Sequence, residues 1–214
     1  MLKADFHVHT FYSKCSNMNP KNIIKTALKK DYDVLGVVDH NNIKGGLKTK
    51  KIAGGRLLVI PGEEIKTNYG EIIVFLSDGN YNRNLFDICE RAKSMNHFIV
   101  VPHPFDYLRR GVKDNIDKVK KMDAIEVFNS RVWVNRFNLI AKAYAEKNKI
   151  PQVVGSDAHF LEEIGNATAF LECEKNIDSI FNCLKKNKLK FSYKRCSIYS
   201  HFKSNVNLPI KRLF

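Results

Sequence analysis

Short hydrophobic runs alternate with longer amphipathic segments along most of the chain. Runs of strand length lie at residues 2–8, 34–38, 57–61, 71–76, 98–101, 124–128, 152–155 and 167–171. Segments in which apolar residues recur at helical spacing lie between them, at residues 20–30, 82–95, 112–121, 132–147 and 177–186. Strands and helices in this alternation are typical of βα units around a parallel sheet. The pattern therefore predicts an α/β barrel of seven or eight strands.

Two parts of the chain depart from this alternation. The strands expected at residues 57–61 and 71–76 are separated by the turn-like residues 67–70, and no helix lies between them. Beyond the last predicted helix the periodicity fades. We expect a barrel domain at residues 1–187 and a basic C-terminal extension at residues 188–214, which packs on the barrel or trails from it.

The composition fits one globular domain. A chain of 214 residues with 44% hydrophobic residues can bury one substantial core and is short for two. It contains no run of 18 apolar residues, and the first candidate motif begins at residue 7, which leaves no room for a signal peptide. We expect a cytoplasmic protein that does not contact a membrane. The sequence does not predict the oligomeric state.

The cysteines and the net charge narrow the classes of function. The five cysteines are widely spaced and contain no Cys-x-x-Cys pair, which argues against a disulfide framework and a zinc knuckle. The net charge of +14 would attract polyanions such as nucleic acid, nucleotides or phosphorylated metabolites. A proteome rich in lysine would give the same charge, so both interpretations stay open.

Histidines and carboxylates follow directly after five of the predicted strands. These residues are His7 and His9, Asp39 and His40, Glu63 and Glu64, His103, and Asp157 and His159. A parallel barrel brings the C-terminal ends of its strands to one mouth, so these side chains would converge there. One such histidine is more often structural than a ligand. Five groups together predict a site for zinc, manganese or iron, the metals that imidazoles and carboxylates bind.

Five short motifs carry these residues. They are Asp5-Phe6-His7-Val8-His9-Thr10, Val38-Asp39-His40-Asn41, Pro61-Gly62-Glu63-Glu64, His103-Pro104 and Gly155-Ser156-Asp157-Ala158-His159. In this order the motifs resemble those of the PHP (polymerase and histidinol phosphatase) domain family of metal-dependent phosphoesterases, and the resemblance extends to about residue 172. It implies a distorted (β/α)7 TIM-like barrel with a metal site at the C-terminal mouth of its strands.

The resemblance also implies two or three divalent metal ions, Zn, Mn or Fe. The first ion would be held by His7, His9, Glu64 and Asp157. Glu64 would bridge to a second ion that His103 also binds, and His40 and His159 would hold the third. Glu63 is expected to be a neighbour of this site and not a ligand.

Two positions depart from the family pattern. Glu71 stands where the family usually has a histidine, and a carboxylate there would favour harder metals such as manganese or iron. Whether Glu71 is a ligand or a solvated strand residue stays open. Cys15 lies in the region where the family tends to have an aspartate or a histidine. We expect Cys15 to be a bystander, although a thiolate could bind metal, and this leaves the third ion open.

Further polar residues are expected around the metal ions. Asp39, Glu126 and Asn129 would orient the ligands through hydrogen bonds. Arg109, Arg110 and Arg131 are expected to bind a substrate phosphate, with a solvated helix start as the alternative. We expect Asp157, Arg109 and Arg110 to take part in catalysis. His97 and His201 match no motif and are interpreted as ordinary surface or helix-end histidines.

The resemblance implies a metal-dependent phosphoric ester hydrolase in which a metal-bound hydroxide attacks phosphorus. The substrate would be a phosphomonoester or phosphodiester of a nucleotide, an oligonucleotide or a phosphorylated metabolite. A nucleic-acid partner stays open, because basic and aromatic residues mix near the C-terminus and could follow a strand and stack on its bases. A basic helix face followed by an edge strand with buried aromatics would look the same, and the sequence slightly favours this alternative. The basic and aromatic residues are Lys185, Lys186, Lys188, Lys190, Phe191, Tyr193, Lys194, Arg195, Tyr199 and Phe202.

Two other functions are the alternatives to this one. A metal-dependent amidohydrolase also begins with a His-x-His motif, but it would need neither Asp39-His40 nor the late pair of Asp157 and His159. A non-catalytic RNA-binding barrel would share the basic surface but would have lost the ligands, which are largely present here. The sequence favours the phosphoesterase over both.

Overall fold

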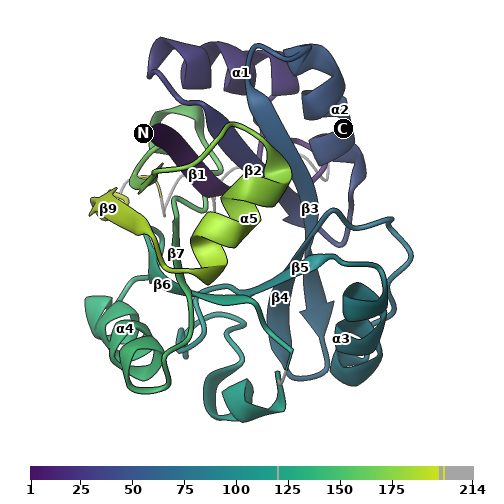
Figure 1. Cartoon of the computed structure of the whole chain (residues 1–214), viewed down its shortest axis with the longest axis vertical. Coiled ribbons are helices and arrows are strands. Elements are labelled where there is room, and N and C mark those ends of the chain that lie inside the picture. The colour runs from purple at the N-terminus through teal and green to yellow at the C-terminus, as the bar shows by residue number, and fades with distance from the viewer. Residues whose placement is uncertain (120, 198–199, 201–214) are drawn as a thin grey trace.

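Nine strands form one continuous sheet that curls into a nearly closed barrel in the computed structural model, which describes residues 1–119, 121–197 and 200 (Figure 1). The strands are β1 (Leu2–Val8), β2 (Val34–His40), β3 (Leu58–Thr67), β4 (Gly70–Phe75), β5 (Phe98–Val101), β6 (Ala124–Asn129), β7 (Gln152–Gly155), β8 (Ala167–Leu171) and β9 (Leu189–Tyr193). Their order in the sheet is β7-β6-β5-β4-β3-β2-β1-β8-β9. The α/β barrel expected from the sequence is confirmed.

The barrel wall is mostly parallel but contains one reversed strand. The pairs β1–β2, β2–β3, β5–β6 and β6–β7 are parallel, whereas β4 is antiparallel to both β3 and β5. The short turn at residues 67–70 leads directly into this hairpin, so regular βα alternation is broken here. The outer strands β8 and β9 are also antiparallel to their neighbours.

The segment after β7 closes the barrel against β1. The amide of His9 donates to the carbonyl of Ala158 at 3.0 Å, and the amide of Ala158 donates to the carbonyl of His7 at 3.1 Å. These hydrogen bonds join the first and the last sequence motifs. Residues separated by about 150 positions in the sequence therefore become neighbours at the barrel mouth.

Three of the five α-helices in the described part of the chain begin at an asparagine that caps them. The five helices are α1 (Pro20–Lys29), α2 (Lys44–Ala53), α3 (Leu85–Ser94), α4 (Asn135–Lys147) and α5 (Ile177–Lys185). The side chains of Asn19, Asn84 and Asn176 accept backbone N–H groups at the starts of α1, α3 and α5. Such caps satisfy amides that have no partner inside the helix. Figure 1 shows α1 to α4 around the outside of the barrel and α5 across one end of it.

Aromatic side chains close the end of the barrel that α5 covers. The ring of Phe181 on α5 stacks on Phe98 at the start of β5, with centroids 4.3 Å apart. Phe181 also lies 6.2 Å from Phe75, at the last residue of the reversed strand β4. This end is therefore filled with apolar side chains, and the opposite end is the mouth where the polar motifs lie.

Three helical predictions were wrong in extent, and the first is the helix expected at residues 82–95, which starts at Leu85. Residues 112–121 were expected to form an α-helix, but only a 3-10 helix, η1 (Lys113–Lys118), forms there. Lys113 has a φ of 54°, which is incompatible with a continuous α-helix, and its amide donates to Pro104 at 2.7 Å. Helix α4 starts at Asn135 and not at Val132, because the preceding Val134 is extended.

The C-terminal extension begins with strand β9 on the edge of the sheet. The amide of Cys196 then donates to the carbonyl of Ser130 at 2.8 Å, so the chain runs back beside β6. Tyr193 is half exposed and stacks on Phe128, with centroids 4.1 Å apart. The predictions for His201, Tyr199 and Phe202 concern positions outside the described residues. Within the described part of the chain, no helix has the length and apolar character needed to cross a membrane.

Candidate metal centre

The strand ends at the mouth bring the predicted ligands together. Residues two apart on a strand point to the same face, which places His7 and His9 side by side. His40 at the end of β2 pairs in register with Glu64 on β3. Because β4 runs in the opposite direction, its first residues lie at this mouth, and Glu71 is one of them.

The first group contains the four side chains expected to bind the first metal ion. The Nε2 atoms of His7 and His9 lie 3.2 Å apart. Asp157 Oδ1 lies 3.1 Å from His9 Nε2 and 3.6 Å from His7 Nε2. Glu64 Oε2 lies 3.6 Å from His7 Nε2 and 3.5 Å from His9 Nε2. All four side chains are buried. The ligand atoms of His7, His9 and Glu64 all lie within 4.8 Å of one another, and Asp157 Oδ1 faces the two histidines, as the donor atoms of a metal site would.

The second group contains Glu64, Glu71 and His103. Glu64 Oε1 lies 3.0 Å from His103 Nε2, while its other oxygen faces the first group. Glu71 Oε2 lies 3.9 Å from His103 Nε2. The Glu64 carboxylate therefore offers one oxygen to each group, which is the arrangement that a bridging ligand needs. Glu71 lies among the ligands and is buried, so it is not a solvated strand residue.

The third group contains His9, His40 and His159. The ring centroid of His9 lies 4.7 Å from that of His40 and 4.4 Å from that of His159. Cys15 Sγ lies 3.0 Å from His159 Nε2. Cys15, expected to be a bystander, thus contacts the group. Glu63 lies apart from the three groups and accepts a hydrogen bond from the Ser77 hydroxyl.

Two ligand positions have a left-handed backbone. His103 has a φ of 28° and Asp157 has a φ of 54°, and each is the second residue after the end of a strand. Such conformations cost about 1–3 kcal/mol each in residues other than glycine and cluster at functional sites. The fold holds these two side chains in positions that local backbone preference opposes.

The charges in the centre shift one another's pKa values. Burial alone would lower the pKa of His7, but Asp157, Glu126 and Glu64 raise it well above the usual value. Burial would raise the pKa of Glu64, but His40 and His7 hold it well below the usual value. Burial and the nearby Glu64 raise the pKa of Glu71 to about 7. The carboxylates are thus close enough to raise the pKa of one another and of the histidines, so the site favours bound positive charge.

A cavity of about 310 Å³ opens over the three groups. Its wall includes His40, His103, Asp157, Arg110 and Cys15. In the part of the chain that the structure describes, two buried side-chain atoms form no hydrogen bond of acceptable geometry, and these are Glu64 Oε2 and His103 Nδ1. Glu64 Oε2 nevertheless lies 2.9 Å from His40 Nδ1, and it lies 3.6 and 3.5 Å from the Nε2 atoms of His7 and His9. A carboxylate oxygen surrounded by imidazole nitrogens in this way is a position that a divalent cation would satisfy. The residues present therefore fit metal ions.

Sequence comparison connects the chain to known proteins. Residues 135–189, from α4 to the start of β9, match the family model PHP_C, described as PHP-associated. The uncharacterized protein MJ0417 of Methanocaldococcus jannaschii is 39% identical over 174 residues, which cover 78% of this chain and 69% of that protein.

Solved structures share the fold. PsfC from Pseudomonas syringae gives a TM-score of 0.69 at 18% identity and 98% coverage of both chains. Endonuclease Q, solved with a duplex bearing an abasic lesion at its active site, gives a TM-score of 0.68 at 16% identity. The match covers 86% of this chain and 56% of the Endonuclease Q chain. A Bifidobacterium adolescentis protein described as a suggested metal-dependent phosphoesterase gives a TM-score of 0.61 at 13% identity. The match covers 73% of this chain and 87% of that protein. The family-model match at residues 135–189, together with the five motifs in their order, shows that the chain belongs to the PHP family.

These structural likenesses show the fold of the PHP domain and do not identify its substrate. An amidohydrolase from Chromobacterium violaceum, solved with sulfate, also shares the fold, with a TM-score of 0.58 at 13% identity, over 73% of this chain and 87% of its own. The surroundings of the metal centre therefore carry the argument about chemistry.

Glu126 and Asn129 support the ligands of the PHP centre. Glu126 Oε1 lies 3.0 Å from His7 Nδ1, and its Oε2 accepts the amide of His103 at 2.8 Å. Asn129 Nδ2 donates to Glu126 Oε2 at 2.9 Å and to Asp157 Oδ2 at 3.2 Å. One buried carboxylate and one amide thus orient ligands from three strand ends.

Asp39 holds the loop that follows β1. Its Oδ1 accepts the amide of Thr10 at 2.8 Å and the hydroxyl of Ser13 at 2.6 Å. Ser13 Oγ also lies 3.3 Å from His9 Nδ1 and accepts the amide of His40 at 3.0 Å. Asp39 therefore supports His9 through Ser13.

The three predicted arginines lie in different environments. Arg109 donates to Asp106 Oδ2 at 2.8 Å, to Asp157 Oδ2 at 2.7 Å and to Asn129 Oδ1 at 3.2 Å. Arg131 is buried and donates to Glu163 Oε1 at 2.6 Å, although it also borders the cavity. Arg110 is exposed on the cavity rim. Arg110 is therefore the best placed of the three to meet a substrate anion.

Three buried carboxylates near the centre were missed by sequence reasoning. Asp5 accepts amides of Ser156 and Gly165, and burial raises its pKa to about 6. Glu163 accepts the amides of His159 and Phe160, and Asp106 pairs with Arg109. Asp5 opens the first motif, which was a usable signal, whereas nothing in the sequence marks the other two.

His97 is buried, not exposed, and bonds to the Tyr81 hydroxyl at 2.6 Å.

Proposed function

We propose that this PHP domain is a metal-dependent phosphoesterase that hydrolyses a phosphomonoester or phosphodiester of a nucleotide, an oligonucleotide or a phosphorylated metabolite. The observation that carries the proposal is the set of three overlapping ligand groups beneath one cavity with an arginine on its rim. Relatives of the fold described as a phosphoesterase and as an endonuclease with bound DNA support the same class of reaction.

Two or three divalent ions, Zn, Mn or Fe, would be held by His7, His9, His40, Glu64, Glu71, His103, Asp157 and His159. When bound, such ions lower the pKa of a coordinated water toward neutrality and neutralise phosphate oxygens. The harder carboxylate ligands at the second group favour manganese or iron there over zinc.

The residues around the centre would position the ligands and the substrate. Burial would raise the pKa of Asp157, but His7 and Arg109 hold it well below its usual value. Asp157 therefore stays ionised, with Oδ1 toward His9 and Oδ2 on Arg109. Arg110 would contact a phosphate oxygen at the rim, because a guanidinium binds phosphate through paired hydrogen bonds.

The amidohydrolase and the non-catalytic RNA-binding barrel remain the alternatives. His40 lies 2.9 Å from Glu64, and His159 lies beside His9, so both motifs that an amidohydrolase would not need belong to the centre. A binding protein that had lost catalysis would not need three groups of buried ligands. Both observations favour phosphoester hydrolysis.

The proposal is tested by hydrolysis assays on the purified protein loaded with manganese, zinc or iron. The substrates are mononucleotides, nucleoside bisphosphates, sugar phosphates, short oligonucleotides and, for the alternative, small amides. We expect phosphate or nucleotide release from at least one phosphoester and no amide cleavage. Amide cleavage alone, or a protein that binds no metal and cleaves nothing, would contradict the proposal.

Substitution of a ligand gives the largest expected effect. His9 is shared by the first and third groups, so His9→Ala is expected to lose bound metal and to lower kcat by at least about 10³-fold. Metal content is measured by elemental analysis beside the assay. His97→Ala, outside the centre, is the control and should retain both metal and turnover. Equal losses in the two variants would show that His9 has no special role.

A further inference from the structure

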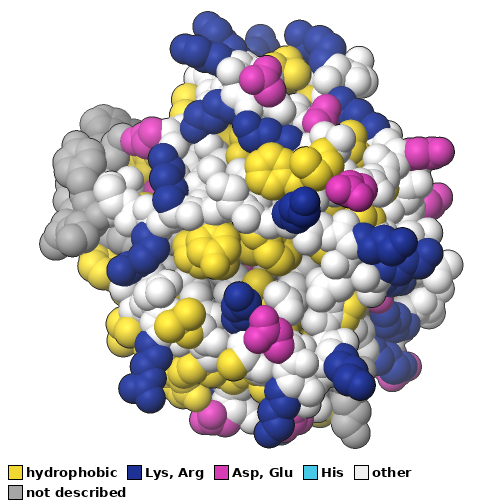
Figure 2. All heavy atoms as spheres, turned by 60° about the vertical axis from the view of Figure 1, so that its left-hand side comes forward, with side chains coloured by type: hydrophobic (Ala, Val, Ile, Leu, Met, Phe, Trp, Pro, Cys, Tyr) yellow, Lys and Arg dark blue, Asp and Glu magenta, His cyan; other side chains and the backbone are white. Residues whose placement is uncertain are grey.

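Positive charge alone does not locate a binding site on this protein. On the face shown in Figure 2, Lys and Arg side chains are spread across the surface between hydrophobic patches. The net charge of +14 is thus not concentrated in one strip of that face. A more specific feature lies at the edge of the metal centre.

A second cavity, of about 260 Å³, adjoins the cavity over the metal centre. The two cavities share Arg109 and Arg110 in their walls. The second cavity is also lined by Lys66 and Lys113, and its wall contains four basic residues and no Asp or Glu. A concave surface with this composition is suited to an anion.

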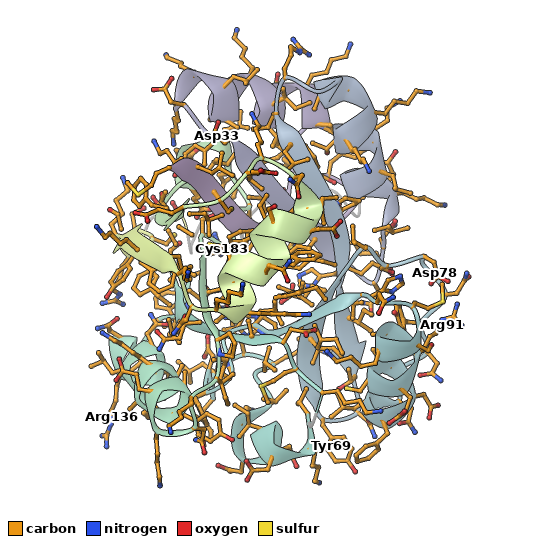
Figure 3. The ribbon with its side chains drawn as sticks, viewed as in Figure 1. Asp33, Tyr69, Asp78, Arg91, Arg136 and Cys183 are labelled. Atoms are coloured by element: carbon orange, nitrogen blue, oxygen red, sulfur yellow. The ribbon has the colours of Figure 1, made fainter. Side chains whose placement is uncertain are left out.

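The second cavity is built between two loops that are packed tightly together. One is the turn between β3 and β4, where Tyr69 is labelled in Figure 3, and the other is the segment after β5. A Cβ atom at Gly70 would lie 2.7 Å from Val112 Cα, so only glycine permits this approach. The amide of Glu71 donates to the carbonyl of Arg110 at 2.8 Å. These contacts hold the basic side chains of both loops around one space.

The basic residues of this cavity differ in how their charge is used. Arg109 is neutralised by Asp106 and Asp157. Across the described residues, no carboxylate lies within 4.0 Å of the charged groups of Lys66, Arg110 or Lys113. Lys66 pairs in register with Glu71 across the hairpin, which puts it on the same face as the second metal group. Lys113 Nζ lies 5.9 Å from the centre of the Tyr107 ring, but no carboxylate neutralises its charge. Three cations without a carboxylate partner thus lie beside the metal centre.

We propose that the second cavity binds a second phosphate of the substrate while the phosphate to be hydrolysed lies over the metal centre. This inference rests on the proposed function. A phosphate fits better than a base, because Lys118 lies 4.0 Å above the Tyr69 ring and covers it. The substrate class is therefore one with at least two phosphates, supplied by a nucleic-acid strand or by a small bisphosphorylated compound.

The test uses a double variant, Lys66→Ala with Lys113→Ala, in the metal-loaded protein. The control, Lys25→Ala with Lys48→Ala, removes the same two charges from exposed positions on α1 and α2. The probes are adenosine 3′-monophosphate, adenosine 3′,5′-bisphosphate and a fluorescent oligothymidylate of twelve nucleotides. Their Kd values are measured by calorimetry and by fluorescence anisotropy at several salt concentrations.

We expect the double variant to bind the monophosphate as the wild type does and at least one multiphosphate probe about tenfold more weakly. For the oligonucleotide, the slope of log Kd against log salt should fall by about two, one for each lost contact. A loss for both multiphosphate probes shows that one further phosphate suffices. A loss for the oligonucleotide alone identifies a strand as the ligand.

The inference is overturned if the double variant and the control bind every probe equally well. Hydrolysis assays on the same proteins separate this outcome from a failure of the proposed function. Selective loss of multiphosphate binding without cleavage of any phosphoester would retain the second site and reject the hydrolase. Cleavage of a phosphoester, with unchanged binding of every probe in the double variant, would retain the hydrolase and reject the second site.

Discussion

The two ends of the barrel are built from opposite kinds of side chain. The end under α5 is closed by Phe75, Phe98 and Phe181, whose rings pack against one another. The mouth instead buries imidazoles and carboxylates such as His7 and Glu64. Apolar burial stabilises a fold, whereas buried charges cost free energy unless they are paired. One end therefore supports the fold, and the other end is arranged for binding.

This difference explains why the mouth is surrounded by hydrogen bonds. Several of the buried ligands there have a supporting partner, as Glu126 supports His7 and Ser13 supports His9. The apolar end needs no such partners, since its rings carry no polar atoms. A substitution at the apolar end should therefore affect stability, and a substitution at the mouth should affect metal binding.

The largest expected change in stability comes from Phe181→Ala. The substitution removes a ring that stacks on Phe98, and comparable large-to-small changes cost about 3–5 kcal/mol. We expect the free energy of unfolding to fall by about 4 kcal/mol, measured by urea denaturation, while the metal content of the folded protein stays the same.

Leu139→Ala on the exposed side of α4 is the control for this variant. Leu139 is 60% exposed, so its loss should change the free energy of unfolding by less than about 1 kcal/mol. A large change in metal content for Phe181→Ala would show that the two ends of the barrel are coupled and would break the comparison.

A smaller effect, confined to the mouth, is expected from Glu126→Gln. The amide would place an NH₂ group where one carboxylate oxygen now faces either His7 or the amide of His103. Loss of such a supporting partner lowers metal affinity by about 10- to 100-fold. Titration of the metal-free protein with manganese measures this loss.

Glu90→Gln on α3 is the matched control, because Glu90 is exposed and forms an ion pair with Lys121, and α3 contributes none of the proposed ligands. Its metal affinity should equal that of the wild type. If Glu126→Gln also bound metal as tightly as the wild type, the role of Glu126 in orienting His7 would be refuted.

The sequence predicts the two ends unequally well. The strands and the residues that follow them are visible because apolar runs have a definite length and the ligand motifs come directly after them. The reversed β4 follows from the short turn at residues 67–70, and it explains why Glu71 reaches the mouth. These features depend on residues close together in the sequence.

Features that depend on loop packing could not be predicted in this way. The ion pairs of Arg109 are one example, because its guanidinium is bonded to both Asp106 and Asp157, which lie on different segments. The salt bridge between Arg131 and Glu163 likewise joins residues that no motif connects. The path of η1 is set by the left-handed Lys113, which periodicity does not reveal.

Cys15 gives the smallest and most specific test of the mouth. Its sulfur lies 3.0 Å from His159 Nε2, at the edge of the third group, and a bound cation deprotonates a coordinating thiol. If the thiolate is a ligand, the cobalt-substituted protein should show sulfur-to-cobalt charge-transfer absorption. Cys15→Ser should abolish that absorption and weaken binding of one ion by about tenfold, while the other ions are retained.

Cys173→Ser serves as the control, since Cys173 is partly exposed and packs near the apolar core. It should leave the absorption unchanged. Absorption that survives in Cys15→Ser would mean that the thiol only neighbours His159, and the third group would then consist of imidazoles alone. Loss of the absorption in Cys15→Ser would instead show that the third group has a softer set of ligands than the carboxylate-rich second group. The two groups would then prefer different metals.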